Sequence, residues 1–224
     1  PTPQPMPTPQ PMPTPESKST TQKSPQNTVK YDRKAVVEYA KKYAESGETN
    51  PKYERFDLDY GWLWFRLGGG DCANFVSQVL HESGIPMNDE WYFRKKRKER
   101  LLFGYKNTSE WSPKWTVADQ HYRYFRDKRY SVEDIKITSP HQLVELHKSG
   151  KVKPGDLLYW DWDGDGVINH ATVITHTKQA LKYSGHTSDK FNGDVYTKFL
   201  EVQSKNNNKT IVRVVRMKDE IPVK

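Results

Sequence analysis

Residues 68–80 read GGGDCANFVSQVL and contain the single cysteine of this 224-residue chain. The glycines allow unusual backbone angles, and the residues after Asp71 predict an amphipathic helix over residues 72–83. The apolar positions that share one face of this helix are Phe75, Val76, Val79 and Leu80. Unpaired N–H groups and partial positive charge at a helix N-terminus favour thiolate over thiol. Cys72 is therefore a candidate nucleophile, expected to be partly exposed with a depressed pKa, and a buried apolar filler is the alternative.

The segments on either side of this helix predict an α+β fold. Helical periodicity and capping signals predict helices at 31–46, 72–83, 113–126 and 140–150. Short apolar segments separated by turn residues predict strands at 156–162, 167–176, 180–186, 195–202 and 210–217. Helices followed by strands are typical of an α+β domain with an antiparallel sheet.

The N-terminal segment differs in composition from the rest of the chain. Residues 1–29 are rich in proline and repeat PTPQPM in tandem, which predicts a disordered or polyproline II linker. Residues 30–224 are long enough for one domain. The chain begins with proline and shows no signal segment, so we expect a fragment of a larger secreted protein. A single cysteine excludes an internal disulfide, and no apolar run suggests a membrane span.

A thiolate nucleophile needs a base, and His170 is the best candidate among seven histidines. It lies in GDGVINHATVIT, at the start of an apolar strand that would hold the ring rigidly. A half-buried structural histidine is the alternative interpretation. The other histidines on predicted helices, His121, His141 and His147, are expected at the surface.

A third group should orient the imidazole by accepting its second N–H. His186 ends the next predicted strand and would be a neighbour of His170 across a hairpin. Asp189 and Asn192, in the loop that follows, are the alternative third groups.

Several motifs together resemble one family. The strings GGGDCANFVSQVLHESGIPM, KPGDLLYWDWDGDGVINHATVIT and YSGHTSD are similar to a bacterial amidase-domain family grouped with the NlpC-type, papain-like cysteine peptidases and amidases. The resemblance extends from about residue 31 to about residue 202 and implies a cysteine-bearing helix packed on a sheet that carries the histidine. Cys72 and His170 match the nucleophile and base positions, while Asn169 stands where many relatives have Asp.

The resemblance implies a secreted or cell-wall-associated cysteine hydrolase that cleaves amide bonds of peptidoglycan peptides through a thioester. Cys72 would attack the carbonyl, its backbone N–H would stabilise the oxyanion, and His170 would move the proton. One alternative is a non-catalytic wall-binding or adhesion module on the same fold. Another is a peptidyl or acyl transferase that uses the same thioester chemistry.

A loop before His170 is a candidate calcium site. Asp161, Asp163 and Asp165 occupy alternate positions like those of a calcium-binding loop, but Thr172 stands where a bidentate Glu belongs. An Asp/Gly-rich turn between strands explains the same residues without metal. We expect no cofactor, with calcium as the one candidate.

Two further segments are candidate binding surfaces. Residues 93–100, FRKKRKER, carry six positive charges and one negative, which suits either a solvated loop or an anionic wall polymer. The chain has a formal net charge of +8, but no nucleic-acid-binding motif accompanies it, so no nucleic acid partner is expected. Trp62 and Trp64 precede the glycines and are candidates for a groove wall or for the core.

Overall fold

The computed structural model describes residues 27–56, 70–96, 99–101, 104–106 and 109–223. Its centre is a six-stranded antiparallel sheet with the strand order β10-β9-β8-β7-β11-β6. The strands are β6 Ser131–Ile137, β7 Leu157–Asp161, β8 His170–His176, β9 Lys182–Gly185, β10 Lys190–Asp194 and β11 Ile211–Met217. Mixed helices and antiparallel strands confirm the α+β class predicted from the sequence.

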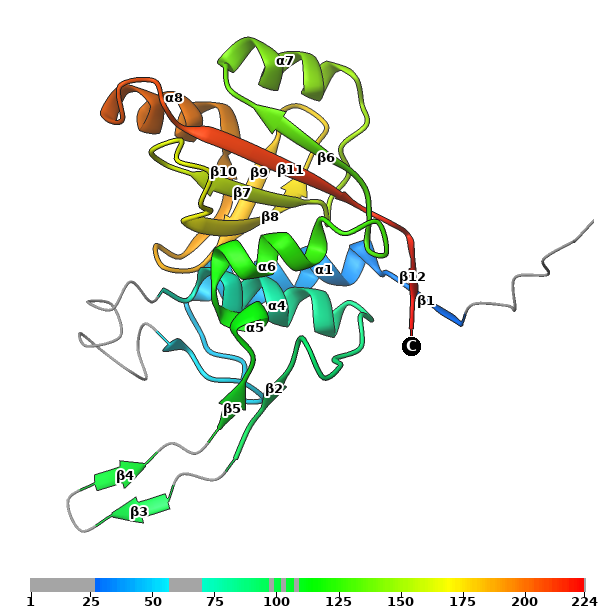
Figure 1. Cartoon of the computed structure of the whole chain (residues 1–224), viewed down its shortest axis with the longest axis vertical. Helices are drawn as coiled ribbons and strands as arrows, with labels where there is room; N and C mark the ends of the chain where they lie inside the picture. The colour runs from blue at the N-terminus through cyan, green and yellow to red at the C-terminus, as the bar shows by residue number, and fades with distance from the viewer. Residues whose placement is uncertain (1–26, 57–69, 97–98, 102–103, 107–108, 224) are drawn as a thin grey trace, which may run out of the picture.

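Helices cover both faces of this sheet (Figure 1). One face packs against α1 Arg33–Ala40, its π-helical continuation Lys41–Glu45, α4 Cys72–Glu82, α5 Pro113–Thr116 and α6 Ala118–Phe125. The other face packs against α7 Pro140–Lys148 and α8 Val195–Lys205. Successive residues of a strand point to opposite faces, so each strand contributes to both cores. On β7, for example, Tyr159 packs on the α4 side and Trp160 on the α8 side.

Three short strand pairs lie outside the main sheet. They are β1 Thr28–Lys30 with β12 Glu220–Pro222, β2 Phe93–Arg94 with β5 Glu110–Trp111, and β3 Glu99–Leu101 with β4 Gly104–Lys106. The β3–β4 hairpin projects away from the body of the molecule (Figure 1). Thr28 and Val29 were expected in the linker, but they pair with β12 and Val29 packs against the core.

None of the helices in the described ranges has the length and apolarity of a membrane span.

The strand predicted over residues 195–202 is wrong, because this segment forms helix α8. The side chain of Asp194 caps the helix by accepting a hydrogen bond from the Thr197 N–H at 2.8 Å. Val195, Phe199 and Val202 are buried on one side at spacings of four and three residues, which is the period of a helix face. Strand β6, by contrast, was not predicted from the sequence.

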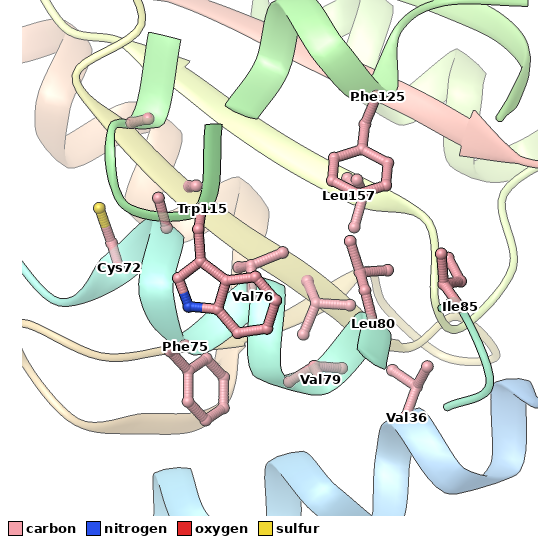
Figure 2. Packing of buried hydrophobic residues seen from close by; sticks show 14 of the residues in the cluster. Val36, Cys72, Phe75, Val76, Val79, Leu80, Ile85, Trp115, Phe125 and Leu157 are labelled. Carbon is pink, nitrogen blue, oxygen red and sulfur yellow. The ribbon is translucent and has the colours of Figure 1, made fainter. Parts of the chain in front are cut away.

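Helix α4 is buried from Cys72 to Leu80, and Figure 2 shows the apolar side chains that pack around it. Phe75, Val76, Val79 and Leu80 are all 0% exposed, between α1 on one side and the sheet with α5 and α6 on the other. Its buried polar side chains also have partners. Gln78 Oε1 accepts a hydrogen bond from the Tyr39 hydroxyl at 2.7 Å, so α4 is held by polar as well as apolar contacts.

Arg33 links the first helix to the sheet. Its guanidinium donates to Asp219 at 2.6 Å, to Asp156 at 2.9 Å and to the carbonyls of Pro154 and Met217. The Asp156 carboxylate is 1% exposed, so the guanidinium compensates a charge that water does not reach.

We predict that Arg33→Ala lowers the free energy of unfolding by about 3–5 kcal/mol, because it removes the cation that pairs with the buried Asp156 carboxylate. Denaturant titration measures the change. Lys34→Ala is the matched control, since the Lys34 side chain is 85% exposed and pairs with Glu38 on the same helix. Its effect should stay below about 0.5 kcal/mol. Equal effects of the two substitutions would contradict the role of Arg33.

His121 was expected at the surface, but it is 0% exposed on α6. Nδ1 lies 2.7 Å from the Tyr159 hydroxyl, and Nε2 has no hydrogen-bond partner within the described part of the chain. The helix turns this position inward against Phe125 and the sheet. Burial lowers the pKa of His121 to about 3.

This burial predicts a loss of stability in acid. The unfolded chain binds the His121 proton near pH 6.5 and the folded chain only near pH 3, so stability falls as pH drops between these values. At pH 4 the loss due to His121 is about 3 kcal/mol. His121→Gln should reduce the difference in unfolding free energy between pH 7 and pH 4 by about that amount, measured by denaturant titration at both values. His141→Gln, at an exposed position, should leave this difference unchanged.

Candidate active site

A cavity of about 700 Å³ opens at the N-terminal end of α4. It is lined by residues of α4, α5, α6 and α8 and by the end of the sheet where β8 begins and β9 ends. Three residues predicted from the sequence line it: Cys72, His170 and His186. The fold therefore brings the predicted nucleophile and base to one cavity.

Cys72 is the first residue of α4, as predicted, but its environment differs from the expectation. The residue is 6% exposed, and burial raises the pKa of its thiol to about 11. The Asp71 carboxylate adds to this increase, whereas the backbone N–H groups of Ala171, Ala73 and Cys72 itself act to lower the pKa. The helix start thus favours the thiolate as expected, but desolvation outweighs it.

His170 begins β8, and its side chain approaches the cavity from the α8 side of the sheet. It pairs across the ladder with Trp160, whose side chain belongs to the α8-side core, and its ring stacks on Trp162 with centroids 5.7 Å apart. The next residue, Ala171, faces α4 instead. In the described ranges no hydrogen bond joins the ring nitrogens of His170 to Cys72 or to any other group.

The surroundings of His170 keep its ring neutral. Burial lowers the pKa of the imidazole to about 4, and the nearby Lys198 ammonium lowers it further. At neutral pH the resting site therefore contains a thiol and a neutral imidazole rather than a thiolate–imidazolium pair.

Within the described residues His186 makes no hydrogen bond with His170, and both of its ring nitrogens have other partners. Nδ1 lies 2.6 Å from Asp71 Oδ2, and Nε2 lies 3.2 Å from the Tyr43 carbonyl oxygen. His186 is 3% exposed and Asp71 0% exposed. The hydrogen bond to His170 that was predicted from hairpin geometry is thus replaced by one to Asp71.

Asp71 is the residue whose role the sequence did not indicate. It precedes α4, but its side chain does not cap the helix. Oδ1 accepts hydrogen bonds from the Phe56 N–H and the Asn74 side-chain amide, both at 2.8 Å. Burial raises the pKa of Asp71, while its hydrogen bonds to His186, Asn74 and Phe56 act to lower it. The position of Asp71 next to Cys72 could have pointed to this role, but two of its partners, Phe56 and His186, lie 15 and 115 positions away.

The alternative third groups also lie away from His170. Asp189 Oδ1 accepts a hydrogen bond from the Arg55 guanidinium at 2.7 Å. Asn192 Oδ1 accepts one from the Thr175 hydroxyl at 2.8 Å. Neither makes a hydrogen bond with His170 in the described residues.

The predicted calcium loop has the geometry of a tight turn. Asp161 accepts backbone hydrogen bonds from Gly164 and Gly166, one on each carboxylate oxygen, at 2.8 and 3.0 Å. One oxygen from each of Asp161, Asp163 and Asp165 lies within 4.8 Å of the others. The turn explains the position of Asp161, and calcium binding stays a prediction.

The other predicted surfaces are only partly described. Trp62 and Trp64 lie outside the described residues, as do residues 97–98 of the basic segment 93–100. Within that segment, Lys95 donates to the carbonyls of Pro51 and Tyr53 at 2.6 and 3.0 Å. Lys96 pairs with Glu110. These two lysines therefore contribute to the fold as well as to the surface charge.

The buried thiol predicts slow alkylation at neutral pH. With a pKa of about 11, roughly one Cys72 thiol in ten thousand is ionised at pH 7. The rate of iodoacetamide labelling, followed by mass spectrometry, should rise continuously to at least pH 10. In guanidinium-unfolded protein the same thiol should titrate near pH 8.5. A plateau of the native rate below pH 8 would show instead an activated thiolate in the resting protein.

Comparison with known proteins places the chain in a family. Residues 30–213 match the family model described as "Putative amidase domain". The chain is 29% identical over 150 residues to the uncharacterized protein YhbB of Bacillus subtilis (strain 168); the match covers 64% of this chain and 37% of YhbB. No solved structure matches the chain. Because the family model covers most of the chain, this protein belongs to the putative amidase domain family, whose description points to amide hydrolysis.

Proposed function

We propose that this protein is a papain-like cysteine hydrolase that cleaves amide bonds in peptidoglycan peptides through a thioester. The observation that carries the proposal is the placement of Cys72. The only thiol of the chain stands at the start of a buried helix, has backbone N–H groups directed at it, and shares a substrate-sized cavity with His170. The family match supports the amide substrate class.

In the proposed reaction the thiol proton passes to the His170 imidazole as Cys72 Sγ bonds to the amide carbonyl carbon. The backbone N–H of Cys72, at the first helical position, stabilises the oxyanion. The C–N bond then breaks, and the imidazolium gives its proton to the leaving amine. Water next attacks the thioester and passes a proton to His170. The C–S bond breaks, and the sulfur regains a proton from His170.

This sequence requires His170 to turn from Trp162 toward Cys72. Two features support such a change. His170 is half-buried at the end of its strand, and the amide of the adjacent Ala171 is close enough to the sulfur to affect its pKa. A substrate entering the cavity would supply the contacts that favour the turned rotamer.

His186 has a positioning role in this proposal. Its hydrogen bond holds Asp71, the residue before Cys72, and its ring packs against Phe75 with centroids 4.1 Å apart. The pair thereby sets where α4 begins and where the thiol points. No proton-transfer step of the proposed reaction passes through His186.

The proposed setting is the bacterial cell wall, outside the cell. A papain-like domain from the β1 strand onward would follow a proline-rich linker, and the segment 93–100 would add attraction to an anionic wall polymer. Calcium at Asp161, Asp163 and Asp165 would tie down the loop that leads to His170. A transferase would follow the same steps with an amine in place of water, and an added amine acceptor would reveal it.

A non-catalytic wall-binding module is the competing function. The absence of a hydrogen bond between Cys72 and His170 in the described structure favours it, as does the raised thiol pKa. On this alternative the cavity would bind wall peptides without cleaving them.

Incubation with purified peptidoglycan, followed by mass spectrometry of the muropeptides, separates these functions. The wild type should release fragments with new amino and carboxyl termini, and Cys72→Ala should release none. His170→Ala should lower the rate at least about 100-fold, because general acid–base catalysis is lost. His176→Ala is the matched control at the other end of β8 and should stay within about twofold. Retention of binding with no cleavage by the wild type would favour the binding module.

A further inference from the structure

We propose that the hydroxyl of Thr187, in the loop between β9 and β10, is a catalytic group that donates a hydrogen bond to the oxyanion formed at Cys72. The inference rests on the proposed function for the thioester chemistry, but it is testable without a wall peptide. A carbonyl oxygen that becomes negative during acyl transfer is stabilised by each donor already directed at it. The Cys72 N–H supplies one such donor, and Thr187 would supply a second.

Thr187 is held against the residue that precedes the thiol. Its Oγ1 accepts a hydrogen bond from the Asp71 N–H at 3.2 Å, and the preceding residue, His186, lies 2.6 Å from the Asp71 carboxylate. Thr187 also lines the cavity that Cys72 and His170 line. Two adjacent loop residues therefore bind the same residue, and the hydroxyl lies beside the amide that precedes the Cys72 N–H.

The hydrogen-bonding state of this hydroxyl leaves its proton available to a ligand. A threonine hydroxyl has one O–H donor and two acceptor positions. The Asp71 N–H uses one acceptor position, and among the described groups the Thr187 O–H has no acceptor of its own. The residue is exposed, so a molecule in the cavity can reach it. An N–H that donates to the hydroxyl oxygen also polarises the O–H bond, which makes Thr187 a better donor.

The backbone conformation of Thr187 also indicates that the surrounding structure specifies its position. Its φ is 81°, in a region that β-branched residues rarely adopt. Gly70 allows the close approach, because a Cβ at that position would lie 3.1 Å from Thr187 Oγ1. Strained backbone at residues other than glycine is concentrated at functional sites, where neighbouring contacts hold it in place. Strain, close approach and the hydrogen bond to Asp71 therefore converge on the Thr187 side chain.

The test compares two reactions of the Cys72 thiol, of which one forms an oxyanion and the other does not. With p-nitrophenyl acetate, the bond from Sγ to the acetyl carbon forms through a tetrahedral oxyanion. The ester C–O bond then breaks, p-nitrophenolate leaves with the bonding electrons, and the thiol proton passes to His170. Iodoacetamide alkylates the thiolate by direct displacement of iodide. Peptide mass spectrometry measures both rates at Cys72, and their ratio separates oxyanion stabilisation from the access and ionisation of the thiol.

Thr187→Val keeps the branching of the side chain and removes the hydroxyl. It should lower the acetylation rate about 10- to 100-fold, as expected for a lost hydrogen bond to a charged oxygen, and leave alkylation within about twofold. Thr187→Ala, which also lacks the hydroxyl, should reproduce this result. Thr187→Ser retains the hydroxyl and should keep both rates within about threefold of the wild type. Ser188→Ala is the matched control and should change neither rate, because Ser188 is the next residue, is exposed and lines the same cavity.

Equal losses of acetylation and alkylation in Thr187→Val would overturn the inference, because Thr187 would then only position the thiol. Unchanged acetylation, or a loss that Thr187→Ser shares, would overturn it as well. So would a wild-type thiol that is alkylated but not acetylated. If the rate ratio depends on the Thr187 hydroxyl but the wild type cleaves no wall peptide, the inference stands and the proposed hydrolase fails. If Thr187→Val cleaves wall peptides at the wild-type rate, the hydrolase stands and the inference fails.

Discussion

The candidate site depends on the hydrogen bonds of the buried Asp71 carboxylate. One oxygen binds the Phe56 N–H and the Asn74 side chain, and the other binds His186. Phe56 and His186, which lie 15 and 115 positions away, thus converge with Asn74 of α4 on the residue before Cys72. An ionised carboxylate without water is costly unless each oxygen has donors, and here each has at least one. The position of the thiol follows from this arrangement, because α4 begins directly after Asp71.

The sheet also determines how the cavity is built. Cys72 reaches it from the helical layer on one face, while His170 and Lys198 belong to the layer on the other. The cavity lies at the sheet end, where both layers have access to the same space. Groups associated with two separate cores therefore line one cavity.

Periodicity and turn residues in the sequence correctly predicted several helices and strands. The helix that carries Cys72, the strands around Leu157 and His170, and the last long strand were all placed correctly. The segment after Asp194 was misread because VYTKFLEV contains β-branched and aromatic residues. The deciding signals were the Asp194 cap and the burial of every third or fourth residue.

The site was harder to predict because its properties depend on long-range contacts. The sequence brought Cys72, His170 and His186 forward as candidates, and all three line one cavity. It could not reveal that Asp71 binds His186, since the two are 115 positions apart. Nor could it reveal that burial raises the thiol pKa, because desolvation is a property of the packed structure and the helix-terminus effect is visible from sequence alone.

The pairing of β1 with β12 has a mechanical consequence. Thr28 lies opposite Pro222, and the ladder continues inward through Val29 with Ile221 and Lys30 with Glu220. Tension applied between the segments before Thr28 and after Pro222 would separate the two strands one residue pair at a time, as in a zipper. Such opening resists force weakly, because the hydrogen bonds break in succession rather than together. The Arg33 contacts to Asp156 and Asp219 would then be the next barrier before force reached the sheet.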